Sequence, residues 1–124
     1  METDVIGIDI GGTLAKAIVL DSTSFEIKDQ LTIASSDKGP ELVKIIKSLV
    51  GKLEENTKQS FSTLGLGIAG LTHRSGVVRY SPNLPNLIEF PITIEVENEL
   101  GIPVVIGNDA TVGTFAEWKI GAEK

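Results

Sequence analysis

The stretch VIGIDIGGTLAKAIVLD, residues 5–21, decides the fold of this chain. Residues 5–10 alternate between the two faces of an extended strand, so that isoleucines at positions 6, 8 and 10 share one face and Asp9 lies on the other. Residues 14–20 are apolar enough to form a second strand. Because Gly11-Gly12 joins the two runs, the stretch predicts a β-hairpin with a carboxylate near the end of its first strand.

The turn of this hairpin has the chemistry of a phosphate site. Gly11 and Gly12 can turn sharply with positive φ because neither has a Cβ, and their N–H groups and the Thr13 hydroxyl can approach phosphate oxygens. Asp9 can hold the accompanying Mg²⁺ through water. An ordinary hairpin turn is equally consistent with Gly-Gly, and the stretch matches neither a Walker loop nor G-x-G-x-x-G before a helix. The Asn108-Asp109 pair later in the chain favours the phosphate site.

The composition limits the classes to which the chain can belong. Its 124 residues suit one domain, and 41% hydrophobic residues suffice for a core. A net charge of −6 argues against a nucleic-acid partner, and no run approaches the ~18 apolar residues of a membrane span. The acidic N-terminus lacks a signal-peptide pattern. With no cysteine and one histidine, the chain offers no zinc cluster. From the charge and the lack of a membrane span or signal pattern, we expect a cytoplasmic protein without nucleic-acid or membrane partners.

The rest of the chain predicts strands alternating with helices, and hence a mixed sheet with helical cover. After Pro40, apolar residues recur at helical spacing up to Leu53. Residues 91–100 fit a strand or a helix, and Pro91 and Gly101 at their ends favour the helix. The other expected elements are strands at 25–34, 63–71, 77–80 and 103–107 and a helix at 110–121.

Candidate ligand-binding residues follow the ends of the predicted strands. Gly67 and Gly70 lie near the end of a strand whose glycine-lined face lets a ligand approach closely. Asn108 and Asp109 directly follow the last strand, at a helix N-terminus that favours an ionised carboxylate. We expect these residues to meet Asp9 at one edge of the sheet.

The loop SPNLPN, residues 81–86, is stiffened by two prolines. Its Asn83 suits hydrogen bonding to a polyol, although ordinary connecting loops have the same composition. We interpret His73, in the preceding turn, as an exposed loop residue and not as a catalytic one.

Three segments together resemble the ROK family (repressors, open reading frames and sugar kinases) of the actin/hexokinase-like ATPase superfamily. They are IGIDIGGTLAKAIVLD, LGLGIAGLTHRSGVVRYSPNLPN and IPVVIGNDATVGTFAEWKIGAEK, in the family's order. The resemblance implies an α/β, ribonuclease H-like (actin-like ATPase) domain, with a mixed five-stranded sheet flanked by helices. It also implies ATP-dependent phosphorylation of a hexose or amino-hexose, as in glucokinases.

The resemblance gives each candidate residue a role. Asp109 is the implied catalytic base; because a carboxylate with a pKa near ~4 is a weak base, it would orient the sugar hydroxyl and collect the proton late. Lys16 stands where several relatives carry a basic residue, although a solvated strand lysine is an equal interpretation. The expected sugar-binding residues are Asn108, Asn83, Gly67 and Gly70, and the expected residues for Mg-ATP are Asp9 (Mg²⁺ through water), Gly11, Gly12, Thr13 and Lys16.

Two features depart from the family pattern. Leu14 occupies a position that is often polar in relatives, and G-G-T-L-x-K also resembles type II pantothenate kinases, although the NLP and ND segments fit ROK better. Relatives continue with a second phosphate loop, a zinc segment and an adenosine pocket. We therefore expect residues 1–124 to be the N-terminal ATPase-type domain of a two-domain sugar kinase. The C-terminal domain and the zinc site would be absent here, and the full-length protein would be a homodimer.

A non-catalytic sugar-sensing regulator is the main alternative. ROK repressors carry a winged-helix region ahead of this fold, whereas here the motif begins at Val5. The intact Asp109 and Gly11-Gly12 turn also favour the kinase, because a pure sensor does not require them.

Overall fold

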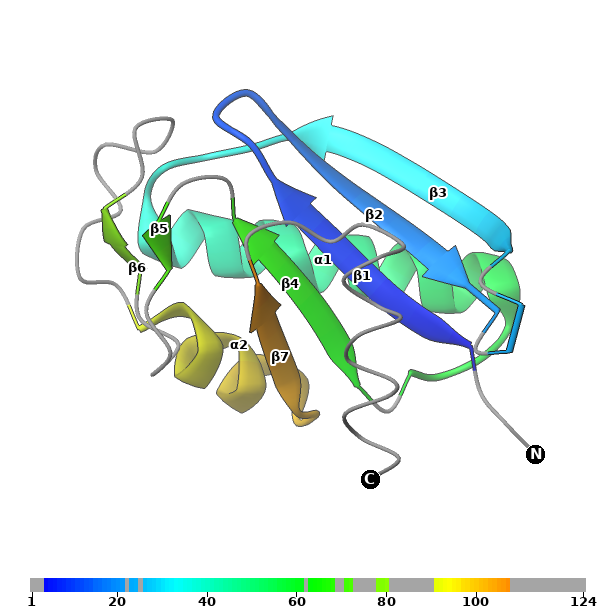
Figure 1. Cartoon of the computed structure of the whole chain (residues 1–124). Coiled ribbons are helices and arrows are strands. Elements are labelled where there is room, and N and C mark those ends of the chain that lie inside the picture. The colour runs from blue at the N-terminus through cyan, green and yellow to red at the C-terminus, as the bar shows by residue number, and fades with distance from the viewer. Residues whose placement is uncertain are drawn as a thin grey trace.

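The computed structural model describes residues 4–21, 23–24, 26–61, 63–68, 71–72, 78–80 and 91–107. The described elements run in the order of three strands, a helix, three strands, a helix and a last strand (Figure 1). No helix in these ranges is long and apolar enough to cross a membrane. The elements are β1 (Val5–Ile10), β2 (Leu14–Leu20), β3 (Ile27–Ala34), α1 (Gly39–Thr57), β4 (Leu64–Ile68), β5 (Leu71–Thr72), β6 (Val78–Tyr80), α2 (Ile92–Leu100) and β7 (Val104–Gly107).

Five strands form one mixed sheet in the order β3-β2-β1-β4-β7 (Figure 1). β1, β2 and β3 pair antiparallel, whereas β4 pairs parallel with β1 and β7 pairs parallel with β4. The predicted mixed five-stranded sheet is confirmed. Because β1, β4 and β7 point the same way, their C-terminal ends meet at one edge of the sheet.

The predicted hairpin of β1 and β2 is confirmed, but its turn is built differently from the expectation. Gly11 does not adopt a positive φ; among the described residues, the glycine that does so is Gly101, at 72°. Instead the N–H of Gly11 donates to the carbonyl oxygen of Leu14 at 2.9 Å. A Cβ on Gly11 would lie 3.2 Å from that oxygen, so glycine is needed here for close backbone approach and not for a left-handed conformation.

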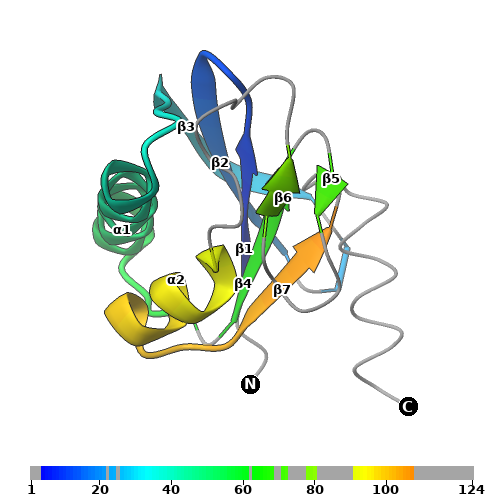
Figure 2. The same ribbon diagram turned by 90° about the vertical axis from the view of Figure 1, so that its left-hand side faces the viewer.

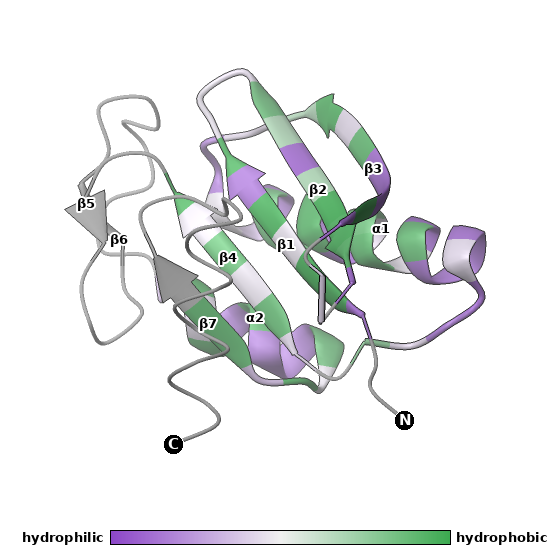
Figure 3. Cartoon of the chain, turned by 45° about the vertical axis from the view of Figure 1, so that its right-hand side comes forward, coloured by the Kyte–Doolittle hydropathy of each residue, from purple (hydrophilic) through white to green (hydrophobic). Residues whose placement is uncertain are grey.

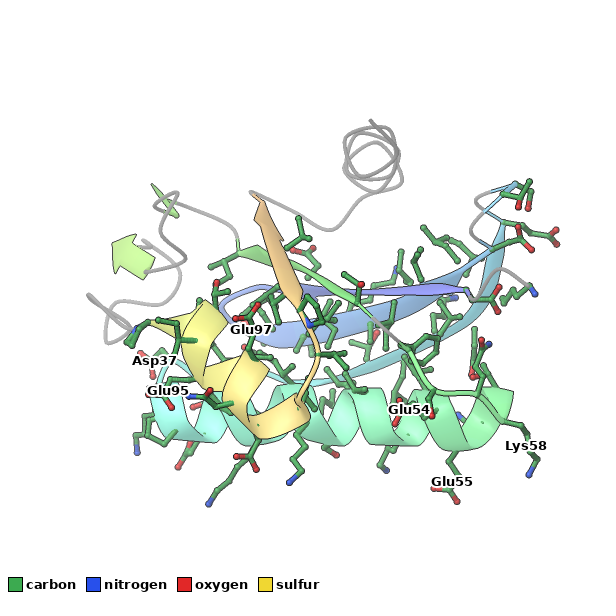
Figure 4. All side chains as sticks on the ribbon, turned by 90° about the horizontal axis from the view of Figure 1, so that it is seen from below. Asp37, Glu54, Glu55, Lys58, Glu95 and Glu97 are labelled. Carbon is green, nitrogen blue, oxygen red and sulfur yellow. The ribbon has the colours of Figure 1, made fainter. Side chains whose placement is uncertain are left out.

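The two described helices cover the same face of the sheet (Figures 2 and 4). The isoleucines of β1 are fully buried beneath them, as the alternation predicts. Hydrophobic residues follow β1, β2 and β4 (Figure 3). The core includes Ile6, Ile8 and Ile10 of β1, Leu42, Ile46, Leu49 and Leu53 of α1, Leu64, Leu66 and Ile68 of β4, and Ile92 and Val96 of α2.

The ambiguous segment at 91–100 is the helix α2, and the chain ends it with a left-handed glycine. Gly101 donates its N–H to the carbonyl of Glu97 at 2.7 Å. The Glu97 carboxylate then accepts the N–H of Val104 at 2.9 Å, where β7 begins (Figure 4). These two bonds fix the short connection between α2 and β7 and favour the helix over the alternative strand.

One predicted strand is shorter than expected. The run expected at 63–71 divides, because β4 ends at Ile68 and Leu71 belongs to a separate two-stranded sheet of β5 and β6. A continuous strand was therefore wrong for its last part. The expected loop at 81–86 and the expected helix at 110–121 lie outside the described residues.

Candidate functional site

Four strands contribute one residue each to a row close to the C-terminal ends of β1, β4 and β7. Asp9 lies opposite Gly67 in the parallel pair of β1 and β4, and Gly67 lies opposite Gly107 in the pair of β4 and β7. In the hairpin, Lys16 lies opposite Asp9. We call Lys16, Asp9, Gly67 and Gly107 the edge row. The expected neighbourhood of Asp9 and Gly67 is confirmed.

The side chains of the edge row belong to the face of the sheet that the described helices do not cover. Ile8 and Ile10 are fully buried in the core beneath α1 and α2, so Asp9 between them points to the opposite face. The residue Asp9 is half-buried and Lys16 is exposed. Gly67 adds no side chain beside the carboxylate, and its backbone is buried.

The hairpin turn lies next to the edge row and is held by two backbone hydrogen bonds. One joins the Gly11 N–H to Leu14, and in the other the Ser35 N–H donates to the Thr13 carbonyl at 2.9 Å. Gly12 and Thr13 are exposed at the tip. Leu14, the departure from the family pattern, is 54% exposed. The two hydrogen bonds therefore hold the turn while its tip, Gly12 and Thr13, is exposed to solvent.

The chemistry of the donors fits a hydrated Mg²⁺ bound through one carboxylate. Within the described ranges, no group of three or more His, Cys, Asp or Glu side chains is arranged to hold a metal. Mg²⁺ does not need such a cage, because it keeps several waters and binds through one or two carboxylates together with substrate phosphates. The half-exposed carboxylate of Asp9 meets that requirement.

Four of the predicted site residues lie outside the described residues. They are Gly70, Asn83, Asn108 and Asp109. β7 ends at Gly107, which is in the edge row and directly precedes Asn108 in the sequence. The roles of these four residues stay predictions.

The sequence analysis missed Ser35, whose N–H fixes the turn. Nothing in a sequence marks a backbone donor, and its partner Thr13 is twenty-two positions away along the chain. The bond becomes visible only once the register is known, in which Ala34 of β3 pairs with Leu14 of β2.

Three residues outside the edge row, Asp21, Lys28 and Glu99, have shifted pKa values in the described part of the chain. The pKa of Asp21 is lowered chiefly because its carboxylate accepts the N–H groups of Ser24 and Thr23. Hydrogen bonding to Asp4 raises the pKa of Lys28. A hydrogen bond from Lys47 of α1, 2.9 Å long, lowers the pKa of Glu99 on α2. These groups tie elements together and carry no sign of catalysis.

A surface hollow of about 280 Å³ lies between α1 and α2. It contains none of the residues that the sequence predicts for the site. Its lining residues are Pro40, Val43, Lys44, Glu95, Asn98 and Glu99. The edge row and this hollow are thus separate features of the surface.

Comparison with known proteins finds sugar kinases among the relatives of this chain. The glucokinase of Streptomyces coelicolor is 32% identical in an alignment of 124 positions. The alignment covers 96% of this chain and 37% of that enzyme. The N-acetylmannosamine kinase of Salmonella agona is 28% identical, covering 91% of this chain and 38% of the relative. The chain thus spans less than two-fifths of the length of these relatives.

A solved structure has the same fold over nearly the whole chain. It is a ROK family glucokinase from Streptomyces griseus in complex with glucose and AMPPNP, 29% identical, with a TM-score of 0.79 over 98% of this chain and 38% of that one. The chain therefore has the actin-like ATPase fold of these kinases. The sequence profile of the ROK family matches residues 5–124, and the chain belongs to that family.

Proposed function

We propose that this chain is the N-terminal domain of an ATP-dependent hexose or amino-hexose kinase, and that the edge row and the adjoining turn bind the phosphates and the metal. The observation that carries the proposal is the juxtaposition of Asp9 with bare glycine backbone at the C-terminal ends of parallel strands. Ligands in open α/β sheets bind at such ends. The family membership supports the same reading.

The proposed chemistry is phosphoryl transfer to a sugar hydroxyl. This reaction requires positioning and charge stabilisation more than covalent help from the protein. Asp109 would orient the attacking hydroxyl and accept its proton, while Asn108 would bind the sugar. Mg²⁺, when bound near Asp9, neutralises charge on the transferred phosphates.

The nucleotide side of the site would be the turn. The exposed Gly12 and Thr13 would donate hydrogen bonds to phosphate oxygens, since bare backbone can approach them closely. Lys16 would add a positive charge next to Asp9 in the edge row. Gly67 and Gly70 would leave space for the sugar, and Asn83 would add a polar contact.

The substrate class follows from the relatives. A glucokinase and an N-acetylmannosamine kinase match with similar identity, so we propose a hexose or an amino-hexose as the acceptor. ATP is the proposed donor because the similar glucokinase structure holds AMPPNP. The adenosine pocket would come from the remainder of the protein, which we expect to be a cytoplasmic homodimer.

Replacing the proposed base tests the function in the longer protein. Asp109→Asn keeps the shape of the side chain but cannot accept the proton, so kcat should fall by roughly two or more orders of magnitude with little change in the KM for sugar. Asp29→Asn, on β3 and away from the edge row, is the matched control and should leave kcat unchanged. A coupled assay of sugar-dependent ADP release measures both variants.

Two outcomes would contradict the proposal. Near wild-type turnover by Asp109→Asn would show that this residue is not the base. Sugar binding by the wild-type protein without any sugar-dependent ADP release would identify a regulator of the sensing type instead of a kinase.

A further inference from the structure

The end of β3 is bonded to the predicted phosphate turn. The last residue pair of the β2–β3 ladder is Leu14 with Ala34, and one step beyond it the Ser35 N–H donates to the Thr13 carbonyl at 2.9 Å. Thr13 is the last residue of the turn. The contact therefore belongs to the turn itself and not to the regular part of the sheet.

This bond fixes the direction of one peptide group. With the Thr13 carbonyl held towards β3, the N–H of Leu14 in the same planar peptide points the other way, towards the inside of the hairpin. A flip of the peptide would exchange these two groups. It would turn a carbonyl oxygen into the hairpin, where the Gly11 N–H pairs with Leu14, and would change the shape of the turn.

The segment that follows Ser35 is itself anchored. The Ser36 hydroxyl accepts the N–H of Lys38 at 3.1 Å and donates to the carboxylate of Glu41 at 2.9 Å, in the first turn of α1. The donor on Ser35 is thus held between the end of β3 and the start of α1. Its position does not depend on the turn that it supports.

The serine hydroxyl has no part in this contact. Within the described atoms, the Ser35 Oγ is buried without a hydrogen-bond partner. Any influence of Ser35 on the turn therefore passes through its backbone N–H. This separation of backbone from side chain makes the contact testable by substitution.

We propose that Ser35 is a positioning residue of the phosphate site: its backbone N–H fixes the Thr13 peptide and with it the shape of the turn that binds the anion. The inference rests on the proposed function, because it assumes that the turn binds phosphate. It adds the residue that directly follows β3 to a site otherwise built from the first hairpin and the parallel strands.

The test compares two substitutions at the same position. Ser35→Pro removes the N–H, whereas Ser35→Ala keeps it and removes only the unpartnered hydroxyl. The dissociation constant of Mg-AMPPNP is measured by calorimetry on the longer protein, together with the melting temperature. We expect Ser35→Pro to weaken binding roughly tenfold and Ser35→Ala to bind within about twofold of the wild type.

A destabilised control separates positioning from general loss of stability. Gly101→Ala disturbs the end of α2, far along the chain from the turn, and should lower the melting temperature without changing the dissociation constant. If Ser35→Pro does not fold, the ester analogue at Ser35, which lacks the N–H but adds no ring, takes its place with the same expected loss of affinity.

Three results would overturn the inference. Unchanged affinity in the variant without the N–H would remove Ser35 from the site and leave the proposed function standing. An equal loss of affinity in Gly101→Ala would show that only stability matters. Absence of Mg-AMPPNP binding by the longer wild-type protein would overturn the proposed function and this inference together.

Discussion

Gly11 is the position at which the turn leaves no space for a side chain. A Cβ there would lie 3.2 Å from the carbonyl oxygen of Leu14. That oxygen cannot simply move away, because it accepts the N–H of Gly11 itself at 2.9 Å. The requirement for glycine thus comes from a backbone hydrogen bond that closes the hairpin.

We predict that Gly11→Ala destabilises the chain by about 1 kcal/mol, the net worth of one hydrogen bond that must lengthen. Urea denaturation measures the free energy of unfolding. Gly12, at the exposed tip, is the neighbouring control, and Gly12→Ala should cost less. Equal effects at the two positions would contradict the assigned cause.

Asp9 shows which structural features a sequence pattern predicts and which it does not. Alternation in residues 5–10 places its carboxylate on the face away from the helices, and the structure confirms this. The pattern does not reveal that Gly67 is its neighbour, since that depends on the register between β1 and β4. The sequence predicts the meeting of strand ends, and only the pairing identifies the residues that meet.

The helices show two glycines with opposite functions. Gly51 is exposed inside α1, and a Cβ built there meets no atom within 4 Å. Gly101 ends α2 with a φ of 72°, where a side chain is strained whatever the space. One glycine weakens its helix and the other terminates its helix.

Alanine at these two positions should have effects of opposite sign. Gly51→Ala should stabilise the chain by about 0.8 kcal/mol through helix propensity, whereas Gly101→Ala should destabilise it by about 1 kcal/mol through a left-handed Cβ. Thermal or urea unfolding of both variants, in the same buffer, checks the pair. Stabilisation by Gly101→Ala would show that the end of α2 is not held in the left-handed conformation.

The elements were predicted better than their ends. Apolar spacing after Pro40 and the pair of Pro91 and Gly101 correctly predicted α1 and α2. The strand expected to continue to residue 71 instead stops at Ile68, because Leu71 pairs with Tyr80 in the small sheet. Local pattern cannot distinguish a strand that continues from one that changes its partner, since both are apolar.

The hydrogen bond between Ser35, directly after β3, and Thr13 of the turn could not be predicted from the sequence for a different reason. Residues 35–39 read as a polar break between a strand and a helix, and the structure confirms a connection there. That break contains Ser35, whose backbone N–H donates to the Thr13 carbonyl. Its role depends on three strands packed in order, which no local sequence pattern records.

At the scale of the whole molecule, the described residues form a sheet with both described helices on one face (Figure 2). Asp9 and Lys16 of the edge row belong to the other face. The chain covers 37% of the glucokinase that it resembles. Phosphoryl transfer needs the donor and the acceptor held in line. The proposed site in this chain supplies only one side of that arrangement.

We therefore predict that the 124-residue chain folds but does not phosphorylate sugars by itself. Without a second domain, water is not excluded from the proposed site, and charge stabilisation there is weaker. The measurement is coupled ADP release with Mg-ATP and a panel of hexoses and N-acetylhexosamines. Sugar-dependent turnover near the typical ~10 s⁻¹ of enzymes would refute the claim that this chain supplies only one side of the active site.

The central claim, that the edge row and its turn bind the phosphates, is tested most directly by mapping amide chemical shifts in the ¹⁵N-labelled chain during titration with Mg-AMPPNP. The account predicts that the shifts concentrate at Gly11, Gly12 and Thr13 and at their neighbours Asp9 and Gly67. Shifts concentrated instead around the hollow between α1 and α2, with the turn unchanged, would contradict it.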